Sequence, residues 1–117
     1  MPEPRLTREL DPWFAPYANY LYDVALANGL SPVVTSAFRS IQKQATLYDR
    51  YLRGLSDLPA APPGRSLHNY GLAFDLVVHS GYRSDAQEAL GRFWRSIGGH
   101  WYPSDPVHFE APVSLPR

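Results

Sequence analysis

The sequence predicts an α+β fold in which a small antiparallel sheet is flanked by helices. Stretches with helical spacing of apolar residues are interleaved with short stretches rich in β-branched residues, and the connections between them are short. The expected strands read as half-buried, which is typical of an antiparallel sheet with helices on one side. With 117 residues, of which 44% are hydrophobic, the chain suits a single domain over residues 1–117 with one modest core.

The N-terminal part predicts an irregular segment and then a helix. Residues 1–16 are Pro-rich and are expected to be irregular, while residues 16–28 carry apolar residues at helical spacing and are followed by Gly29, a typical helix end. The buried stripe of this helix would consist of Tyr17, Tyr20, Leu21, Val24 and Ala25 or Leu26. Residues 31–38, "SPVVTSAF", predict a short strand.

A second helix is expected to begin at Ser40 and to end at Gly54. Its buried stripe would consist of Ile41, Leu47, Tyr48, Tyr51 and Leu52. The Pro-rich stretch that follows, residues 55–65, is too short for a domain linker. It directly precedes the stretch that carries His68 and Asp75, which favours a loop beside a functional site.

Residues 71–78, "GLAFDLVV", predict the central strand. Two-residue alternation places Ala73, Asp75 and Val77 on one face, and Leu72, Phe74, Leu76 and Val78 on the other. Ser84 is expected to cap a third helix, with Gln87 completing a capping box. The tail, residues 100–113, reads as a loop that runs into a short strand, and Trp94, Trp101, Tyr102 and Phe109 are expected in the core.

The composition argues against several classes of partner. Lys and Arg equal Asp and Glu at 11 each, so no net charge attracts nucleic acid or an anionic membrane. No apolar stretch is long enough to span a membrane, and the first ten residues contain no apolar core of a signal peptide. An uncharged domain of this size is expected to be a monomer. There are no cysteines, so a metal would have to be held by His and carboxylate side chains.

Asp75 raises the question of its counter-charge, because a carboxylate in an apolar strand is costly unless something positive meets it. A salt bridge with Arg39 or Arg65 is one answer. A metal held by His68, Asp75 and His108 is another, since two imidazoles and one carboxylate are a standard set for a catalytic zinc. The small Gly71 and Ala73 would let the backbone approach such a site closely.

Two further carboxylates lie near the third of these residues. Asp105 in "DPVHFE" could act as a general base in hydrolysis. Glu110 would share a strand face with His108 and could orient its imidazole. His79 and His100 have no partnered pattern and are given no role.

Three segments, taken in order, resemble the zinc D,D-peptidases and L-alanyl-D-glutamate peptidases of the VanY-like and phage-endolysin-like group. They are "SAFRSIQKQATLY", "SLHNYGLAFDL" and "GGHWYPSDPVHFE". The second matches the Ser-x-His-x-x-Gly-x-Ala-x-Asp run of that family at every defined position. Together the segments cover residues 36–110, and the fold implied is the one these peptidases share with hedgehog signalling domains.

The resemblance implies a role for each matching residue. His68, Asp75 and His108 match the ligands of one zinc ion, Asp105 matches the catalytic acid/base, and Arg39 matches the oxyanion-binding arginine. Ser66 and Gln44 match positions with a structural or substrate-contacting role. Many relatives have Glu where this chain has Asp105, and the endolysin-like branch tolerates Asp there.

The implied function is hydrolysis of an amide bond in the peptidoglycan stem peptide, and the endolysin-like features favour an L-alanyl-D-glutamate endopeptidase. A D-alanyl-D-alanine carboxypeptidase is the alternative, and a non-catalytic zinc-binding recognition module of the same fold is the rival from another class. The protein would act at the bacterial cell wall. Without a signal peptide it would stay in the cytoplasm until lysis, unless a signal had been removed.

Overall fold

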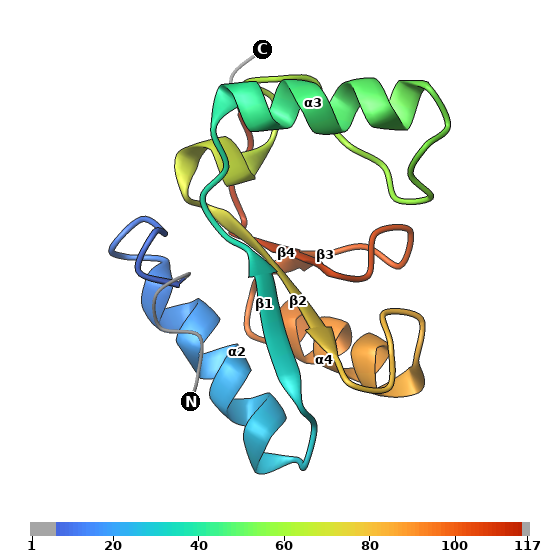
Figure 1. Ribbon diagram of the computed structural model, residues 1–117. Helices are drawn as coiled ribbons and strands as arrows, with labels where there is room; N and C mark the ends of the chain where they lie inside the picture. The colour runs from blue at the N-terminus through green and yellow to red at the C-terminus, as the bar shows by residue number, and fades with distance from the viewer. Residues whose placement is uncertain (1–6, 116–117) are drawn as a thin grey trace.

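A four-stranded antiparallel sheet forms the centre of the computed structural model, which describes residues 7–115 (Figure 1). The strands are β1 (Pro32–Ser36), β2 (Ala73–Val78), β3 (His100–Trp101) and β4 (His108–Glu110). They are ordered β1-β2-β4-β3, and every neighbouring pair is antiparallel. The predicted α+β class with a small antiparallel sheet is therefore confirmed.

Helices α2 (Ala15–Ala27) and α4 (Asp85–Ser96) cover one face of this sheet. The alternation expected for the central strand is observed, because Phe74, Leu76 and Val78 are buried beneath these helices. The Phe74 ring stacks on the Phe109 ring at 5.5 Å between centroids, and Trp94 of α4 meets both rings edge-on. This aromatic cluster supplies much of the apolar core.

Close packing of α4 against Trp101 depends on Gly91, in the middle of the helix. A Cβ atom at this position would lie 2.1 Å from the ring of Trp101, so any side chain would displace the indole. Trp94, Trp101 and Phe109 are buried, as predicted from the sequence. The same prediction is wrong for Tyr102, which lies outside the core. Tyr102 is exposed because it lies in the loop beyond β3 and borders a cleft.

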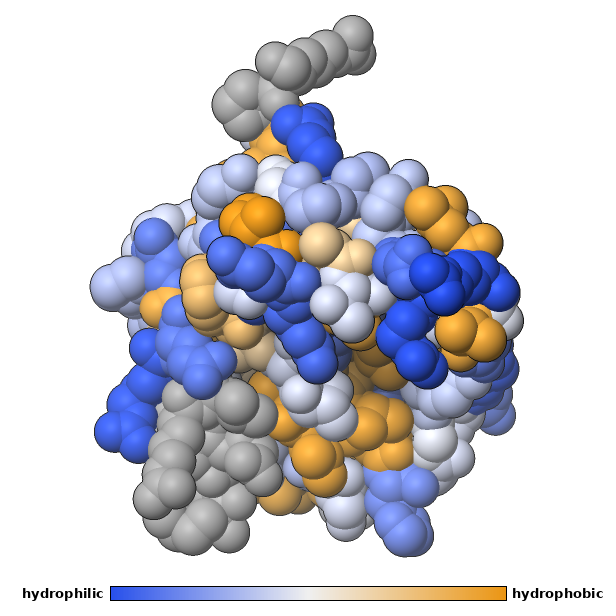
Figure 2. Space-filling model, turned by 45° about the horizontal axis from the view of Figure 1, so that its top comes forward, coloured by the Kyte–Doolittle hydropathy of each residue, from blue (hydrophilic) through white to orange (hydrophobic). Residues whose placement is uncertain are grey.

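Helix α3 (Ile41–Leu52) lies on the other side of the sheet (Figure 1). A cleft of about 1220 Å³ separates the two and is lined by residues of both. The buried stripe predicted for this helix is wrong, since the side chain that α3 buries is that of Gln44. Leu47 and Tyr48 are half-buried, and Ile41, Tyr51 and Leu52 are exposed. Figure 2 shows apolar patches beside hydrophilic ones on this face. The apolar residues of α3 border a cleft and the solvent instead of a core.

The stripe expected for the first helix is wrong in part. The residues that α2 buries are Ala18, Leu21, Tyr22 and Ala25. Tyr17 and Tyr20 each remain 51% exposed, because the helix docks through the face that carries its small alanines. The helix also begins one residue earlier than predicted, so Ala15 and Pro16 belong to it and not to an irregular segment.

The N-cap of α4 corrects the predicted capping box. The Ser84 side chain accepts a hydrogen bond from the Gln87 backbone N–H, as expected. The Gln87 side chain does not return to the N-cap, because it is buried and bonds to strand β2 and to Pro106.

Some predictions fall on residues outside the described part of the chain. Residues 1–6, part of the segment expected to be irregular, lie outside the described residues. Residues 116 and 117 also lie outside them. Between residues 7 and 115, no helix is both long and apolar enough to cross a bilayer.

Candidate metal centre

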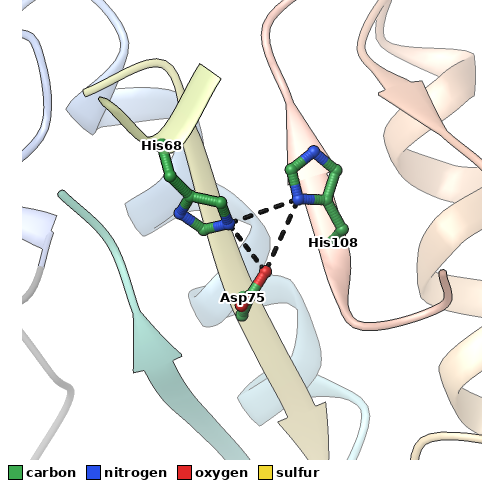
Figure 3. Close-up of side chains that lie close together, drawn as sticks. All are labelled: His68, Asp75 and His108. Atoms are coloured by element: carbon green, nitrogen blue, oxygen red, sulfur yellow. Dashed lines mark hydrogen bonds and ion pairs between the residues drawn. The ribbon is translucent and has the colours of Figure 1, made fainter. Parts of the chain in front are cut away.

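His68, Asp75 and His108 converge at the floor of the cleft from three different elements (Figure 3). His68 belongs to the 3-10 helix η1 (Leu67–Tyr70), Asp75 to β2 and His108 to β4. One nitrogen or oxygen of each side chain lies within 4.8 Å of the other two. Asp75 and His108 are direct register partners across the sheet, so the pairing of β2 and β4 places them on one face.

The turn around η1 positions His68. Ser66 caps it, because the Ser66 hydroxyl accepts a hydrogen bond from the His68 backbone N–H at 3.2 Å. Gly71 ends the turn with a φ of 70°, and a Cβ atom there would lie 2.8 Å from the backbone nitrogen of Asp11. Ser66, predicted to be structural or substrate-contacting, is thus seen in a structural contact.

Hydrogen bonds to the outer nitrogen of each imidazole orient the inner nitrogen toward the site. His68 Nδ1 lies 2.7 Å from the Ala37 carbonyl oxygen, which can only accept, so Nδ1 carries a proton and Nε2 offers a lone pair to the site when the imidazole is neutral. His108 Nε2 donates in the same way to Glu110 at 2.6 Å, which leaves His108 Nδ1 facing the site. Carboxylate or carbonyl partners of this kind are typical of imidazoles that bind metals.

The three inner atoms have the spacing of a metal-ligand set. His68 Nε2 lies 2.9 Å from Asp75 Oδ1 and 3.2 Å from His108 Nδ1, and His108 Nδ1 lies 3.6 Å from Asp75 Oδ1. Ligands of a tetrahedral zinc are about 3.3 Å apart, given metal–ligand distances near 2.0–2.1 Å. Three lone pairs at such distances repel one another unless a cation or protons lie between them. The residues present therefore fit a divalent metal such as zinc.

The electrostatics of the metal-free chain follow from this convergence. Burial by itself would lower the pKa of His108, but the hydrogen bonds to Asp75 and Glu110 and the charges of both carboxylates raise it to about 9. Burial would raise the pKa of Asp75, but the His68 charge and the hydrogen bonds from both imidazoles hold it well below its usual value. In the metal-free chain, a proton on His108 thus supplies the positive charge that a metal ion would supply.

Arg39 meets the other oxygen of the same carboxylate. Its Nη2 donates to Asp75 Oδ2 at 3.1 Å and to Ser36 at 3.0 Å. Its Nη1 donates to Gln44 Oε1 at 3.0 Å, and Gln44 Nε2 donates in turn to the Ala61 carbonyl at 2.8 Å. The salt bridge considered from the sequence therefore exists alongside the candidate metal site, and Gln44 helps Ser36 and Asp75 to hold Arg39 in place.

Asp105 lines the same cleft from the loop between β3 and β4. Burial raises the pKa of its carboxyl group above the usual value, against the nearby charge of His108. Within residues 7–115 its carboxylate has no hydrogen-bond or ion-pair partner. A partly buried, unpartnered carboxylate beside the three ligands is well suited to accept a proton.

The residues that position this loop and β4 were not predicted from the sequence. The Pro106 carbonyl accepts hydrogen bonds from Gln87 Nε2 at 2.8 Å and from Trp101 Nε1 at 2.9 Å, which fixes the backbone between Asp105 and His108. His100, given no role from the sequence, lies with Nδ1 3.7 Å from Glu110 Oε2. A buried Gln in a helix and the register of β3 with β4 are tertiary features, so the local pattern carried no signal for either.

The comparisons with known proteins agree with this geometry. Residues 7–93 match the family profile described as VanY, D-alanyl-D-alanine carboxypeptidase. A D-alanyl-D-alanine carboxypeptidase of Enterococcus faecalis is 32% identical over 80 residues, which cover 57% of this chain and 30% of that protein. The chain thus spans less than a third of the length of this curated relative.

Solved structures share the fold over most of the chain. A mutant of the vancomycin-resistance D,D-pentapeptidase VanY, in complex with Zn(II), is 25% identical with a TM-score of 0.69, covering 89% of this chain and 73% of that one. The LD-carboxypeptidase LdcB is 19% identical with a TM-score of 0.67, over 87% of this chain and 58% of that one. The L-Ala D-Glu endopeptidase ChiX of Serratia marcescens is 20% identical with a TM-score of 0.62, over 96% and 91%. At 19–20% identity the last two show the fold alone, and the fold implied by the sequence resemblance is confirmed.

Proposed function

The chain belongs to the VanY family of D-alanyl-D-alanine carboxypeptidases, and we propose that it is a zinc peptidase that removes a terminal D-alanine from the peptidoglycan stem peptide. One observation carries the proposal most directly. In a member of this family, three side chains that could hold a metal ion converge at the floor of a cleft that Asp105 also lines, and the Asp105 carboxylate has no partner within residues 7–115.

His68 Nε2, Asp75 Oδ1 and His108 Nδ1 would hold the ion, since their outer atoms are already bonded to the protein. Zinc bound there supplies Lewis-acid catalysis and makes water a nucleophile at neutral pH. The VanY structure with Zn(II) supports zinc as the metal, as do the His and carboxylate ligands themselves.

Asp105 takes the role of general acid/base. Its raised pKa makes the carboxylate a better proton acceptor than an ordinary surface aspartate. It accepts the proton of the attacking water and delivers it to the leaving amine. Asp is one methylene shorter than the Glu of many relatives, and the bonds of Gln87 and Trp101 to Pro106 set the backbone position from which this shorter side chain reaches.

Arg39 takes the role of oxyanion stabiliser. A guanidinium has five N–H donors, and three of those of Arg39 are bonded within the described residues, to Gln44, Ser36 and Asp75. The remaining donors are available to the negative charge that develops on the scissile carbonyl.

The carboxypeptidase is better supported than the endopeptidase that the sequence analysis placed first. Both the family profile and the curated relative carry the carboxypeptidase description. The endopeptidase neighbour, at 20% identity, supports the fold alone. The stem peptide as partner and the cell wall as site of action belong to the same proposal.

Zinc-loaded protein incubated with a stem pentapeptide ending in D-Ala-D-Ala, and separately with purified peptidoglycan, tests the proposal by mass spectrometry of the products. Loss of one terminal D-alanine is the expected result, and a chelated sample and Asp105→Asn should be inactive. Fragments that begin at D-glutamate would replace the carboxypeptidase with the endopeptidase. Bound zinc without any product would indicate the non-catalytic recognition module.

A further inference from the structure

The cleft has a wall made of the Pro-rich loop after α3. Residues 54–61 line the cleft as a continuous run, together with Leu47 and Tyr51 of the helix itself. Figure 1 shows this loop descending from the C-terminal end of α3 toward the loop that joins β3 to β4. Anything bound at the metal centre therefore lies next to this loop.

The C-terminal end of the loop, at Ala61 and Gly64, is hydrogen-bonded to residues around the metal centre. The Ala61 carbonyl accepts the hydrogen bond from buried Gln44, which also holds Arg39. The Gly64 carbonyl accepts from the Tyr70 hydroxyl at 2.9 Å. Beyond Ala61 the wall cannot move without disturbing these bonds.

The middle of the loop, residues 56–60, is hydrogen-bonded to the rest of the described chain at one point. For residues 56–60, one hydrogen bond leads to another element of the described chain, and it joins Asp57 Oδ2 to the Tyr82 hydroxyl at 2.6 Å. The other bonds of this stretch are internal, between Ser56 and Leu58. Tyr82 belongs to the segment between β2 and α4.

This contact joins the wall of the cleft, through Asp57, to the loop between β2 and α4. Figure 1 shows α3 linked to the sheet through the segments on the left of the view, while on the right the β3–β4 loop is drawn between the loop after α3 and the β2–α4 loop. Asp57 and Tyr82 tie the loop after α3 to the β2–α4 loop there. A long substrate that leaves the cleft on this side has to pass the contact.

The hydrogen bond between Asp57 and Tyr82 is charge-assisted, and it is also exposed enough to be broken reversibly. The Tyr82 hydroxyl lowers the pKa of Asp57, so the acceptor is a carboxylate at neutral pH. The Arg83 guanidinium lies 4.9 Å from the centre of the Tyr82 ring and steadies that ring. Asp57 is exposed, so water can replace the hydroxyl when the loop swings away.

We propose that Asp57 and Tyr82 form a latch that sets the size of substrate admitted to the metal centre. With the latch closed, small peptides reach the site and bulky cross-linked peptidoglycan strands are disfavoured. With the latch open, residues 56–60 of the wall swing outward while Leu55 and Ala61 stay bonded to α3, and larger substrates enter. This inference rests on the proposed peptidase function.

The test compares Tyr82→Phe and Asp57→Asn with wild type, and uses Tyr20→Phe on the exposed face of α2 as the matched control. Hydrogen–deuterium exchange of residues 54–61 reports on the wall without any need for activity. The ratio of kcat/KM for cross-linked peptidoglycan fragments to kcat/KM for a stem pentapeptide reports on size selection. Both latch variants should exchange faster over 54–61 and raise the ratio about threefold to tenfold, the equilibrium effect of one net hydrogen bond.

Unchanged exchange in both latch variants would overturn the latch, whether or not the protein is a peptidase. Faster exchange with an unchanged ratio in an active enzyme would overturn its role in size selection. If wild type cleaves neither substrate although zinc is bound, the proposed function is overturned and the size limit with it. Faster exchange in Tyr20→Phe as well would overturn the assignment to this hydrogen bond.

Discussion

Two consecutive register pairs of strands β2 and β4 lie on opposite faces of the sheet and have opposite chemistry. Phe74 lies opposite Phe109 beneath α2 and α4, where the two rings stack with an interplanar angle of 15°. Asp75 lies opposite His108 on the face that borders the cleft. One residue along the same strands thus separates an apolar core from a charged site.

The difference shows how a small domain can hold a costly group. The core face gains free energy from apolar area removed from water, and it needs no partner of defined charge. The cleft face carries a desolvated carboxylate, which depends on Arg39 and two imidazoles and would be stabilised further by a metal. Changes on the first face should therefore appear in the free energy of unfolding, and changes on the second in metal binding and turnover.

The largest effect is expected on the core face. Phe74→Ala should lower the free energy of unfolding by about 3–5 kcal/mol, because it removes a stacked ring and leaves a cavity. The folded fraction should still bind one metal ion, since Asp75 lies on the other face. Chemical denaturation and metal analysis of the folded protein measure both quantities. Phe38→Ala, at a half-exposed ring, is the control, and loss of metal from folded Phe74→Ala would contradict the separation of the two faces.

Asp105→Asn should act on the cleft side alone. Turnover is expected to fall by about 10²–10⁴-fold, because the amide cannot accept the proton. Metal content should stay the same, and stability should not decrease, because folding raises the pKa of Asp105 and so disfavours its charged form. Steady-state kinetics with a stem peptide, metal analysis and denaturation test this. Turnover near that of wild type would mean that another group is the base.

Glu110→Gln should have a smaller effect, on the metal itself. The change keeps the shape of the side chain but weakens the acceptor for His108 Nε2, so metal affinity should fall by about 10–100-fold. Competition with a chelator of known affinity measures the change. Glu88→Gln removes an exposed ion pair with Arg92 on α4 and serves as control. Equal affinities in the two variants would remove Glu110 from the site.

The smallest effect is expected on α3, which borders the cleft without covering a core. Leu52 is 64% exposed, so Leu52→Lys should change the free energy of unfolding by no more than about 0.5 kcal/mol. The buried stripe that helical spacing predicts would instead make this change cost several kcal/mol. Denaturation curves decide between the two.

The sequence by itself determined the features that depend on local geometry. Two-residue alternation placed Phe74 and Asp75 on opposite faces, the Ser40 and Ser84 caps marked the starts of α3 and α4, and the motif from Ser66 to Asp75 carried two of the candidate ligands. The predictions of the strand faces and of the caps are confirmed, because strand pleat and helix caps depend on neighbours within a few residues.

The tertiary structure alone decided what each surface meets. Helical spacing in α3 could not tell a core from a cleft, because both are bordered by apolar side chains. The bond from Gln87 to Pro106, the approach of His100 to Glu110 and the contact of Asp57 with Tyr82 join residues between 10 and 25 positions apart. Such contacts depend on how the elements dock, and docking is set by the packing of the whole core, which no local pattern of residues encodes.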